Sequence, residues 1–350
     1  MVQGIYAPSS GGASLITQSC ACACDYLATA KNSVLTPDYY KKNIALLGYA
    51  LMPSPLIEGC NFSAKKSEVA GFLEYGCADE KKSSSKVKRY IRSGRLRDFY
   101  SLTDVSECEL ACDITRFSER LAEFTGDIVD QIMSSAHYKI ESLLMDAIEA
   151  DVIGHEEHGC GSTIIKADTD IMANIDATAG LTNEIISQII AKFQQVGTQA
   201  NDILFVFPVM AVEQFAADSA KNNCCSVQYI TTGNSPYIGT IRQIPVAALT
   251  DERSLFKKKT VTIGGSAKTG IAGYAISRGA LTYAYRKHMA GLSTRSSVSM
   301  SNQMIHLTIA PKDQWDAHDG LTFSAVIHGA AIRSRSERIV RVMFNSNILD

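Results

Sequence analysis

The sequence has little net charge, few prolines and no long apolar run. Only 8 of its 350 residues are proline. The longest apolar stretch, ILFVFPVMAV, spans about half of the roughly 20 residues that a membrane-spanning helix needs, and it contains Pro208. The first residues, MVQGIYAPSSGG, lack the charged and apolar parts of a secretory signal. We therefore expect a protein that is made in the cytoplasm and has no membrane partner.

The formal net charge is −2, which argues against a protein that binds nucleic acid with its whole surface. The charged stretch DEKKSSSKVKR (79–89) is interpreted as a solvated loop, with a basic tract that touches nucleic acid as the alternative. Hydrophobic residues make up 46% of the chain and charged residues 20%, so most of it should fold. A length of 350 residues suits two domains or one elaborate domain.

Ten cysteines are present, but they do not have the C-x-x-C spacing of zinc ribbons. In a cytosolic chain of this length they indicate mostly reduced thiols. A hypothesis left open is that Cys20, Cys22 and Cys24 form disulfides between subunits after cell lysis.

The sequence does not match the common catalytic motifs that its glycine-rich stretch suggests. GGSAKTG (264–270) lacks the lysine that follows the second glycine of a phosphate-binding loop, because Ile271 stands there. The same stretch fails the nucleophile-elbow pattern, because Lys268 occupies the last glycine position. We interpret it as a flexible glycine-rich loop. The sequence therefore predicts no enzyme, no catalytic residues and no cofactor.

The stretch HEEHGCG (155–161) collects metal-binding residue types. A zinc protease needs H-E-x-x-H on one helix face, whereas His155 and His158 are three residues apart and glycines flank them. We interpret the stretch as a loop after a long helix, whose histidines tune subunit contacts with pH. Two alternatives remain open: a metal site made by His155, His158 and Cys160, and a metal-dependent hydrolase that uses His155, Glu156 and His158.

Periodicity predicts an α+β chain. After an extended arm with one short helix near 39–51, apolar residues at helical spacing predict a helical region over 104–153, divided at Gly126 and stopped by Gly154. Shorter elements follow, and strands do not alternate regularly with helices, so a doubly wound nucleotide-binding fold is not expected. The predicted shorter elements are helices 182–197 and 210–223, a buried strand 202–208, and short strands on both sides of a tight turn at Arg242–Gln243.

Towards the C-terminus, residues 251–270 are expected to be a charged, glycine-rich connection, and 270–288 a strand or loop that enters a short helix. Residues 304–310 alternate as a strand does, and 321–332 and 337–344 are expected to be strands of one closing sheet. Four arginines lie close together near the C-terminus: Arg333, Arg335, Arg338 and Arg341. We expect them to form salt bridges with neighbouring chains, with binding of a phosphate backbone as the alternative.

The stretch NDILFVFPVMAVEQFAADSAKNN followed by YIGTIRQIPVAALTDER resembles the core of tailed-bacteriophage major capsid proteins, which have the fold named after phage HK-ninety-seven. The resemblance rests on the order of helix, strand, helix and strand pair. In the strand pair, the G-x-I-x-G-x-P-V form of the family is matched by Gly239, Ile241, Pro245 and Val246, while Gln243 replaces the glycine at the turn. The resemblance is clearest from about Asp104 onward.

The resemblance implies a phage major capsid fold with an N-terminal arm (1–55) and an extended loop region (56–103). A peripheral domain with a long spine helix (104–200), a mainly axial domain (201–303) and C-terminal strands that return to the peripheral domain (304–350) would follow. Two further implications concern function. The protein would assemble with itself, as hexamers and pentamers, into an icosahedral shell that encloses double-stranded DNA without reading its sequence. Its other partners would be scaffolding, portal and decoration proteins. An encapsulin-type compartment shell is the alternative with the same fold.

Overall fold

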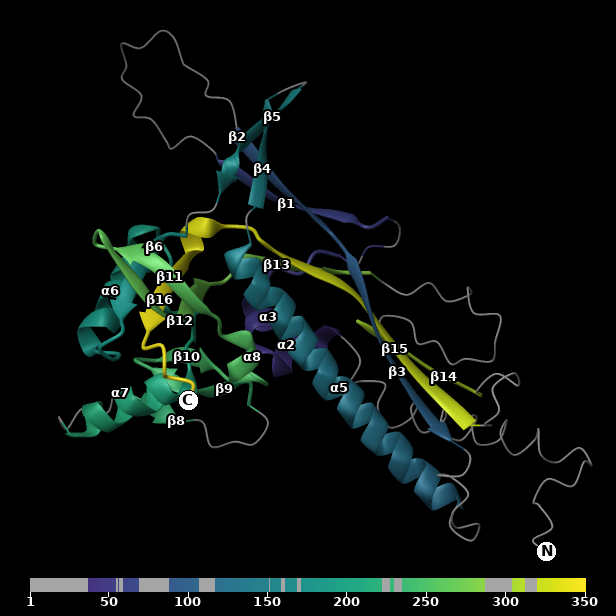
Figure 1. The fold of residues 1–350 in the computed structure, drawn as a ribbon. Coiled ribbons are helices and arrows are strands. Elements are labelled where there is room, and N and C mark those ends of the chain that lie inside the picture. Colours follow the sequence, from purple (N-terminus) through teal and green to yellow (C-terminus); the bar gives the residue numbers. More distant parts are fainter. Residues whose placement is uncertain are drawn as a thin grey trace, which may run out of the picture.

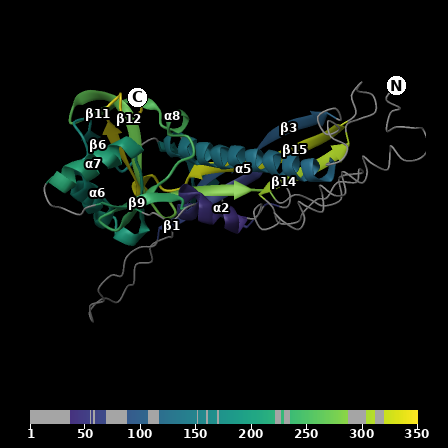
Figure 2. The ribbon, with the colours of Figure 1, turned by 90° about the horizontal axis from the view of Figure 1, so that it is seen from below.

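The computed structural model describes residues 37–54, 56, 59–68, 88–106, 117–150, 152–158, 161–168, 171–221, 227–229, 235–286, 304–311 and 320–350. Residues 1–36 and most of the charged stretch at 79–89 lie outside this range, so the predicted arm is described only from Pro37. The described chain forms three β-sheets and one long helix, and the view from below shows an elongated molecule (Figures 1 and 2).

The long helix is α5 (Phe117–Glu149), which spans 33 residues. Its buried residues recur about every four positions, as one face of a helix requires. The predicted division at Gly126 is wrong, because α5 continues through it; a glycine inside a helix costs only about 1 kcal/mol. The helix also begins later than predicted, because residues 97–106 form a strand. The stripe consists of Ile128, Ile132, Ala136, Ile140, Leu144 and Ile148.

The central sheet has eight strands in the order β6-β16-β12-β7-β10-β9-β8, with β11 paired to β12. Helices α6 (Asn183–Gln195) and α7 (Val209–Lys221) carry apolar stripes that join its core, as the sequence predicted. A 3₁₀ turn (Ala200–Asp202) leads into β7. The strands are β6 (Ala173–Ala177), β7 (Ile203–Val206), β8 (Val227–Tyr229), β9 (Tyr237–Ile241), β10 (Ile244–Ala247), β11 (Lys258–Ile263), β12 (Ser266–Ser277) and β16 (Ile339–Phe344).

The predicted turn between β9 and β10 is confirmed, and it has an unusual composition. Arg242 and Gln243 both have positive φ, 49° and 67°, which glycine and asparagine adopt more readily. The Arg242 guanidinium donates from Nη1 to Ser187 Oγ at 2.8 Å and from Nη2 to Asn183 Oδ1 at 3.1 Å. These bonds tie the turn to the first turns of α6.

Two predictions for residues 251–288 are wrong. The expected connection contains a short helix, α8 (Glu252–Leu255), and the β11–β12 hairpin, whose turn is formed by Gly264 and Gly265 at positive φ. The expected short helix is strand β13 (Leu281–Tyr285). The strand state is favoured by ladder pairing with β15, which contributes hydrogen bonds that no local pattern shows.

The long sheet consists of β3 (Arg97–Ser106), β13, β14 (Ile305–Pro311) and β15 (Gly320–Arg333). Helix α5 packs on one of its faces (Figures 1 and 2). The strands predicted at 304–310, 321–332 and 337–344 are all present, but the last two do not share a sheet. A 3₁₀ turn (Ser336–Arg338) separates β15 from β16, which joins the central sheet.

The hairpin sheet is formed by β1 (Asn61–Glu68), β2 (Lys88–Arg95), β4 (Val152–His158) and β5 (Gly161–Asp168), in the order β1-β2-β4-β5. It lies beyond the C-terminal end of α5 (Figure 1). The predicted loop at HEEHGCG is therefore wrong over its first four residues, which pair with β5 and, up to Glu157, with β2.

Two short helices, α2 (Pro37–Asn43) and α3 (Ala45–Tyr49), occupy the position of the helix predicted near 39–51. Tyr40, Ile44, Leu46 and Leu47 are fully buried in the core that α5 shares with the central and long sheets. No helix among the described residues is long and apolar enough to cross a membrane.

Candidate functional site: the helix junction and the exposed sheet edge

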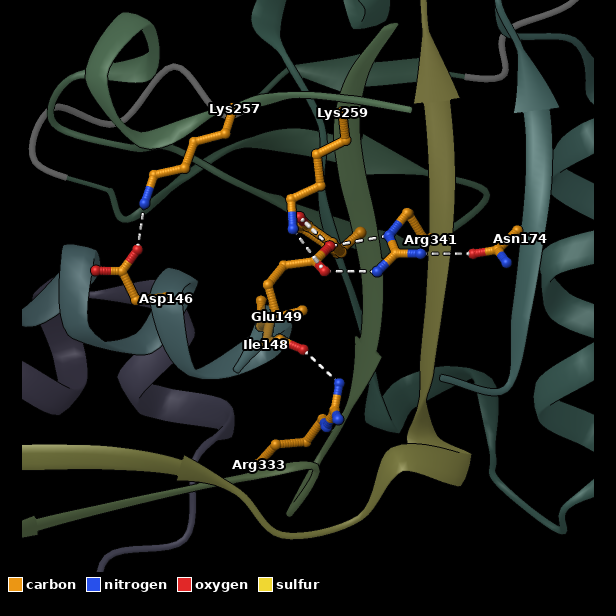
Figure 3. Close-up of polar contacts among 9 residues, drawn as sticks. Asp146, Ile148, Glu149, Asn174, Lys257, Lys259, Arg333 and Arg341 are labelled. Atoms are coloured by element: carbon orange, nitrogen blue, oxygen red, sulfur yellow. Dashed lines mark hydrogen bonds and ion pairs between the residues drawn. The ribbon is translucent and has the colours of Figure 1, made fainter. Parts of the chain in front are cut away.

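The C-terminal turn of α5 is held by a cluster of charged groups from the central sheet, which we call the helix junction. The Glu149 carboxylate accepts two bonds from one edge of the Arg341 guanidinium, from Nε at 2.9 Å and from Nη2 at 2.5 Å. Lys259 Nζ lies 2.7 Å from Glu149 Oε2, and the Tyr274 hydroxyl donates to Oε1 at 2.6 Å. Figure 3 shows Lys259 of β11 and Arg341 of β16 converging on Glu149.

The cluster is mostly shielded from water, which strengthens the electrostatic interactions within it. The Glu149 side chain is 16% exposed and that of Arg341 is 12% exposed. Burial alone would raise the pKa of Glu149, but hydrogen bonds from Arg341, Lys259 and Tyr274 lower it to about 2. Burial, together with the charge of Glu149, raises the pKa of the Tyr274 hydroxyl. At neutral pH the junction is therefore a charged clamp, in which the ionised Glu149 carboxylate is held by Arg341 and Lys259.

Arg333 makes a second contact that stabilises the C-terminal end of α5. It is only 1% exposed, and its Nη1 donates to the carbonyl oxygen of Ile148 at 2.8 Å (Figure 3). The carbonyls of a last helical turn have no partner within the helix, and a cation there also suits the helix dipole. Arg92 in β2 donates from Nη1 to the Arg333 carbonyl at 2.8 Å. This chain of contacts joins the hairpin sheet, the long sheet and α5.

The arginines predicted at contacts between chains therefore act largely within this one. Arg333 and Arg341 fasten α5, and Arg338 donates from Nη1 to the carbonyl oxygen of Arg278 at 2.6 Å. Arg335 is half-buried beside them, at the start of the 3₁₀ turn. Sequence reasoning missed Glu149, Lys259 and Tyr274. The only signal was an acidic residue in the last turn of a helix, where the helix dipole disfavours it.

A further pair of carboxylates fixes the segment before β11. Glu141 is 3% exposed and accepts a bond from the Thr250 amide at 2.9 Å. Glu252 accepts from the Val209 amide with both oxygens, at 3.0 and 3.1 Å, and so caps the start of α7. Burial raises the pKa of both carboxyl groups. These bonds fasten the central sheet and α7 to the middle of α5.

The predicted metal-binding stretch provides no helical site. His155, Glu156 and His158 all belong to strand β4, opposite Ile164, Thr163 and Gly161 of β5 in the ladder. The helical arrangement of a zinc protease is therefore absent. Cys160 lies outside the described residues, as do Cys20, Cys22 and Cys24. No cluster of metal-binding residues is found in the part of the chain whose side chains are described.

Among the described residues, the long sheet presents an exposed face and an unpaired edge on its β3 side. Tyr100 is 82% exposed and Leu102 is 59% exposed, and both lie on the face turned away from α5. Phe99 faces α5, where Lys139 Nζ lies 4.1 Å from its ring centroid. A largely apolar cavity of about 380 Å³ lies between β3 and α5, lined in part by Phe99, Ile132 and Ile327.

The chain has no match among protein-family models, and no curated protein matches it. Solved structures do match its fold. The head structure of Helicobacter pylori bacteriophage KHP40 has a TM-score of 0.53 at 10% identity and covers 89% of this chain and 91% of that one. The capsid of cyanophage P-SCSP1u has a TM-score of 0.52 at 7% identity, with coverages of 85% and 87%.

The acid-stable capsid of Helicobacter pylori bacteriophage KHP30 has a TM-score of 0.50 at 8% identity, and it covers 89% of this chain and 91% of that one. Identities this low establish the fold alone. The chain has the fold of tailed-phage capsid proteins, which confirms the α+β capsid fold that the sequence resemblance implied.

Proposed function

We propose that this protein is a major capsid protein of a tailed bacteriophage, which assembles with itself into an icosahedral shell around double-stranded DNA. The observation that carries the proposal is the capsid fold over 85–89% of the chain. An elongated subunit with a projecting hairpin sheet and an open sheet edge supports it (Figures 1 and 2), because such surfaces are favourable only when neighbours cover them. The role is structural rather than enzymatic.

The proposed parts of the subunit follow the chain. Residues 1–55 are the N-terminal arm, 56–103 contain the extended loop, and α5 in 104–200 is the spine helix of a peripheral domain. Residues 201–303 form mainly the axial domain, and the strands of 304–350 return towards the peripheral domain. The central sheet is the proposed core of the axial part. Since β6 and β16 lie within that sheet, we assign 173–177 and 339–344 to the axial part, and only β14 and β15 of the C-terminal strands return to the peripheral domain.

In this function the helix junction sets the angle between the spine helix and the axial part. The charged clamp on Glu149, the Arg333 bond and the Thr250–Glu141 bond all connect α5 to segments far away in the chain. A shell closes only if its subunits share a consistent shape, so a fixed angle favours uniform assembly.

The proposed partners are other copies of the chain, as hexamers and pentamers, together with scaffolding, portal and decoration proteins. The shell encloses the DNA without binding it strongly, which agrees with a net charge of −2. The protein is made in the cytoplasm of the host bacterium and ends in the virion.

The test is electron microscopy of the purified protein, with absorbance at 260 and 280 nm on the same fraction. Uniform polyhedral shells are expected, and native particles should carry nucleic acid. Shells that hold a protein cargo instead would indicate a compartment of the encapsulin type. Only small particles, under conditions in which capsid proteins assemble, would contradict both.

A further inference from the structure

Strand β3 is a long edge strand that lacks most of the usual protection. It pairs with β15 along its whole length, from Arg97 opposite Gly329 to Ser106 opposite Gly320. No other strand in the described ranges pairs with it. Proteins commonly protect such edges with charged side chains, lysine above all, or with proline, bulges or very short strands. The charges of β3 are confined to Arg97, Asp98 and Asp104, which leaves its centre uncharged. β3 has ten residues, RDFYSLTDVS, with no lysine or proline and an unbroken register.

The outer face of this strand adds an apolar surface beside the open backbone. Tyr100 and Leu102 are two residues apart and therefore share a face, and they are the two most exposed large hydrophobic side chains of the described residues. A backbone edge can be satisfied by an added strand, and side chains at alternate positions then decide which strand fits.

We propose that β3 pairs, antiparallel and about a two-fold axis, with β3 of a second copy of this chain, so that Tyr100 lies opposite Tyr100 of the partner subunit. The contact joins the two long sheets into one. A two-fold contact of this kind closes on itself, because the same strand supplies both sides. The proposal rests on the proposed function, since a shell brings many copies together.

The register follows from the side chains. Opposite residues of an antiparallel pair share a face, so a two-fold axis must place one residue opposite its own copy. An axis at Ser101 would place Asp98 opposite Asp104, and like charges directly opposite are destabilising. An axis at Leu102 would place Tyr100 opposite Asp104, whose carboxylate already accepts a bond from Thr322 Oγ1 at 2.7 Å.

An axis at Tyr100 avoids both problems. It forms an aromatic cross-strand pair at the centre, a type that stabilises sheets, and it places Asp98 opposite Leu102. The ladder then runs from Arg97 to Thr103. This range agrees with the available edge, because the neighbouring Leu96 amide already donates to the Cys60 carbonyl at 2.7 Å.

The size of this contact predicts when it forms. A ladder of this length buries less than the roughly 1,200 Å² of a stable interface, so it should not hold two free subunits together. In a shell, other contacts keep the copies close and raise their effective concentration. The pairing is therefore expected in assembled particles and not in dilute subunits.

Cysteine cross-linking of assembled shells tests the proposal. In Tyr100→Cys, the two substituted positions lie opposite each other, with Cα atoms about 4.5–5.5 Å apart, within the range of a disulfide. Leu102→Cys is the matched control on the same exposed face. In this register its two copies lie about 14 Å apart, from four residues of strand rise and one strand spacing. Particles are oxidised, unfolded with free thiols blocked, and digested for mass spectrometry.

The expected result is a disulfide that joins two copies of the peptide containing position 100 in Tyr100→Cys shells, and at least tenfold less of the equivalent peptide in Leu102→Cys shells. Identifying the peptide separates this bond from those of the native cysteines. Normal shells without the bond at position 100, or with equal bonding in both variants, overturn the pairing and leave the capsid function standing. If the unmodified protein forms no shells, the proposed function fails, and the pairing fails with it.

Discussion

Replacing Glu149 with glutamine removes the charge on which the helix junction depends. The change keeps the shape of the side chain and leaves Arg341 and Lys259, 12% and 28% exposed, without their shared carboxylate. In the folded variant, two positive side chains therefore lie close together with no negative charge between them. We expect Glu149→Gln to lower the free energy of unfolding of the unassembled subunit.

The size of the effect follows from the pKa of Glu149, which is about 2 in the fold against an ordinary 4.5. At about 1.4 kcal/mol per pKa unit, the carboxylate stabilises the fold by about 3 kcal/mol at pH 7. The sign is that of a lowered acid pKa: the contribution is complete above the unfolded pKa and is lost as the pH falls through the folded value. About 2 kcal/mol of it should be lost by pH 3.

The assay is urea unfolding of unassembled subunits, followed by far-ultraviolet circular dichroism at several pH values from 7 to 3. Glu149→Gln should lose about 3 kcal/mol at pH 7 and should show a shallower decline towards pH 3 than the unmodified protein. Asp146→Asn is the matched control from the same end of α5. Its pair with Lys257 is 53% and 60% exposed, so the change should cost less than about 1 kcal/mol. Equal effects of the two substitutions, or parallel pH curves for Glu149→Gln and the unmodified protein, would show that the Glu149 charge does not stabilise the helix junction.

Three further changes test other parts of the fold. Arg333→Met removes the buried donor to the Ile148 carbonyl and should cost about 2–3 kcal/mol in urea unfolding; an unchanged midpoint would show that the bond is dispensable. Gly270→Ala would place a Cβ 2.0 Å from the Phe344 carbonyl oxygen of the neighbouring strand, so we expect a loss of about 3 kcal/mol and a lower thermal midpoint, and a normal midpoint would contradict this. Thr182→Ala removes the N-cap of α6, whose Oγ1 accepts from the Ile185 amide, and should cost about 1 kcal/mol in the same scan, whereas no loss would mean that water replaces the cap.

Elements whose signal is local could be predicted from the sequence alone. The helices α6 and α7, the buried strand β7 and the alternating strand β14 were all predicted, because their apolar residues recur with the period of the element they form. The resemblance to phage capsid proteins drew on the same stretch, where Gly239, Pro245 and Val246 lie in or beside the β9–β10 turn. The order of these locally predicted elements was therefore enough to predict the α+β class and, through the resemblance, the capsid fold.

Elements that depend on distant partners could not be predicted. HEEHGCG is polar and flanked by glycine, so its local pattern indicates a loop, yet β4 forms because β2 and β5 supply ladder partners on both sides. The short helix expected at the end of 270–288 is instead strand β13, because β15 lies beside it.

The same distinction applies to the fold class and to the functional surfaces. Composition, periodicity and motif spacing were enough for the fold class and for the absence of familiar catalytic motifs. The helix junction depended on the tertiary structure, since Glu149 and Arg341 are 192 residues apart in the chain. So did the open edge of β3, because whether a strand has one neighbour or two depends on sheet order. Local patterns record what a residue's immediate neighbours favour, whereas charge pairs and sheet edges depend on which distant segments the fold brings together.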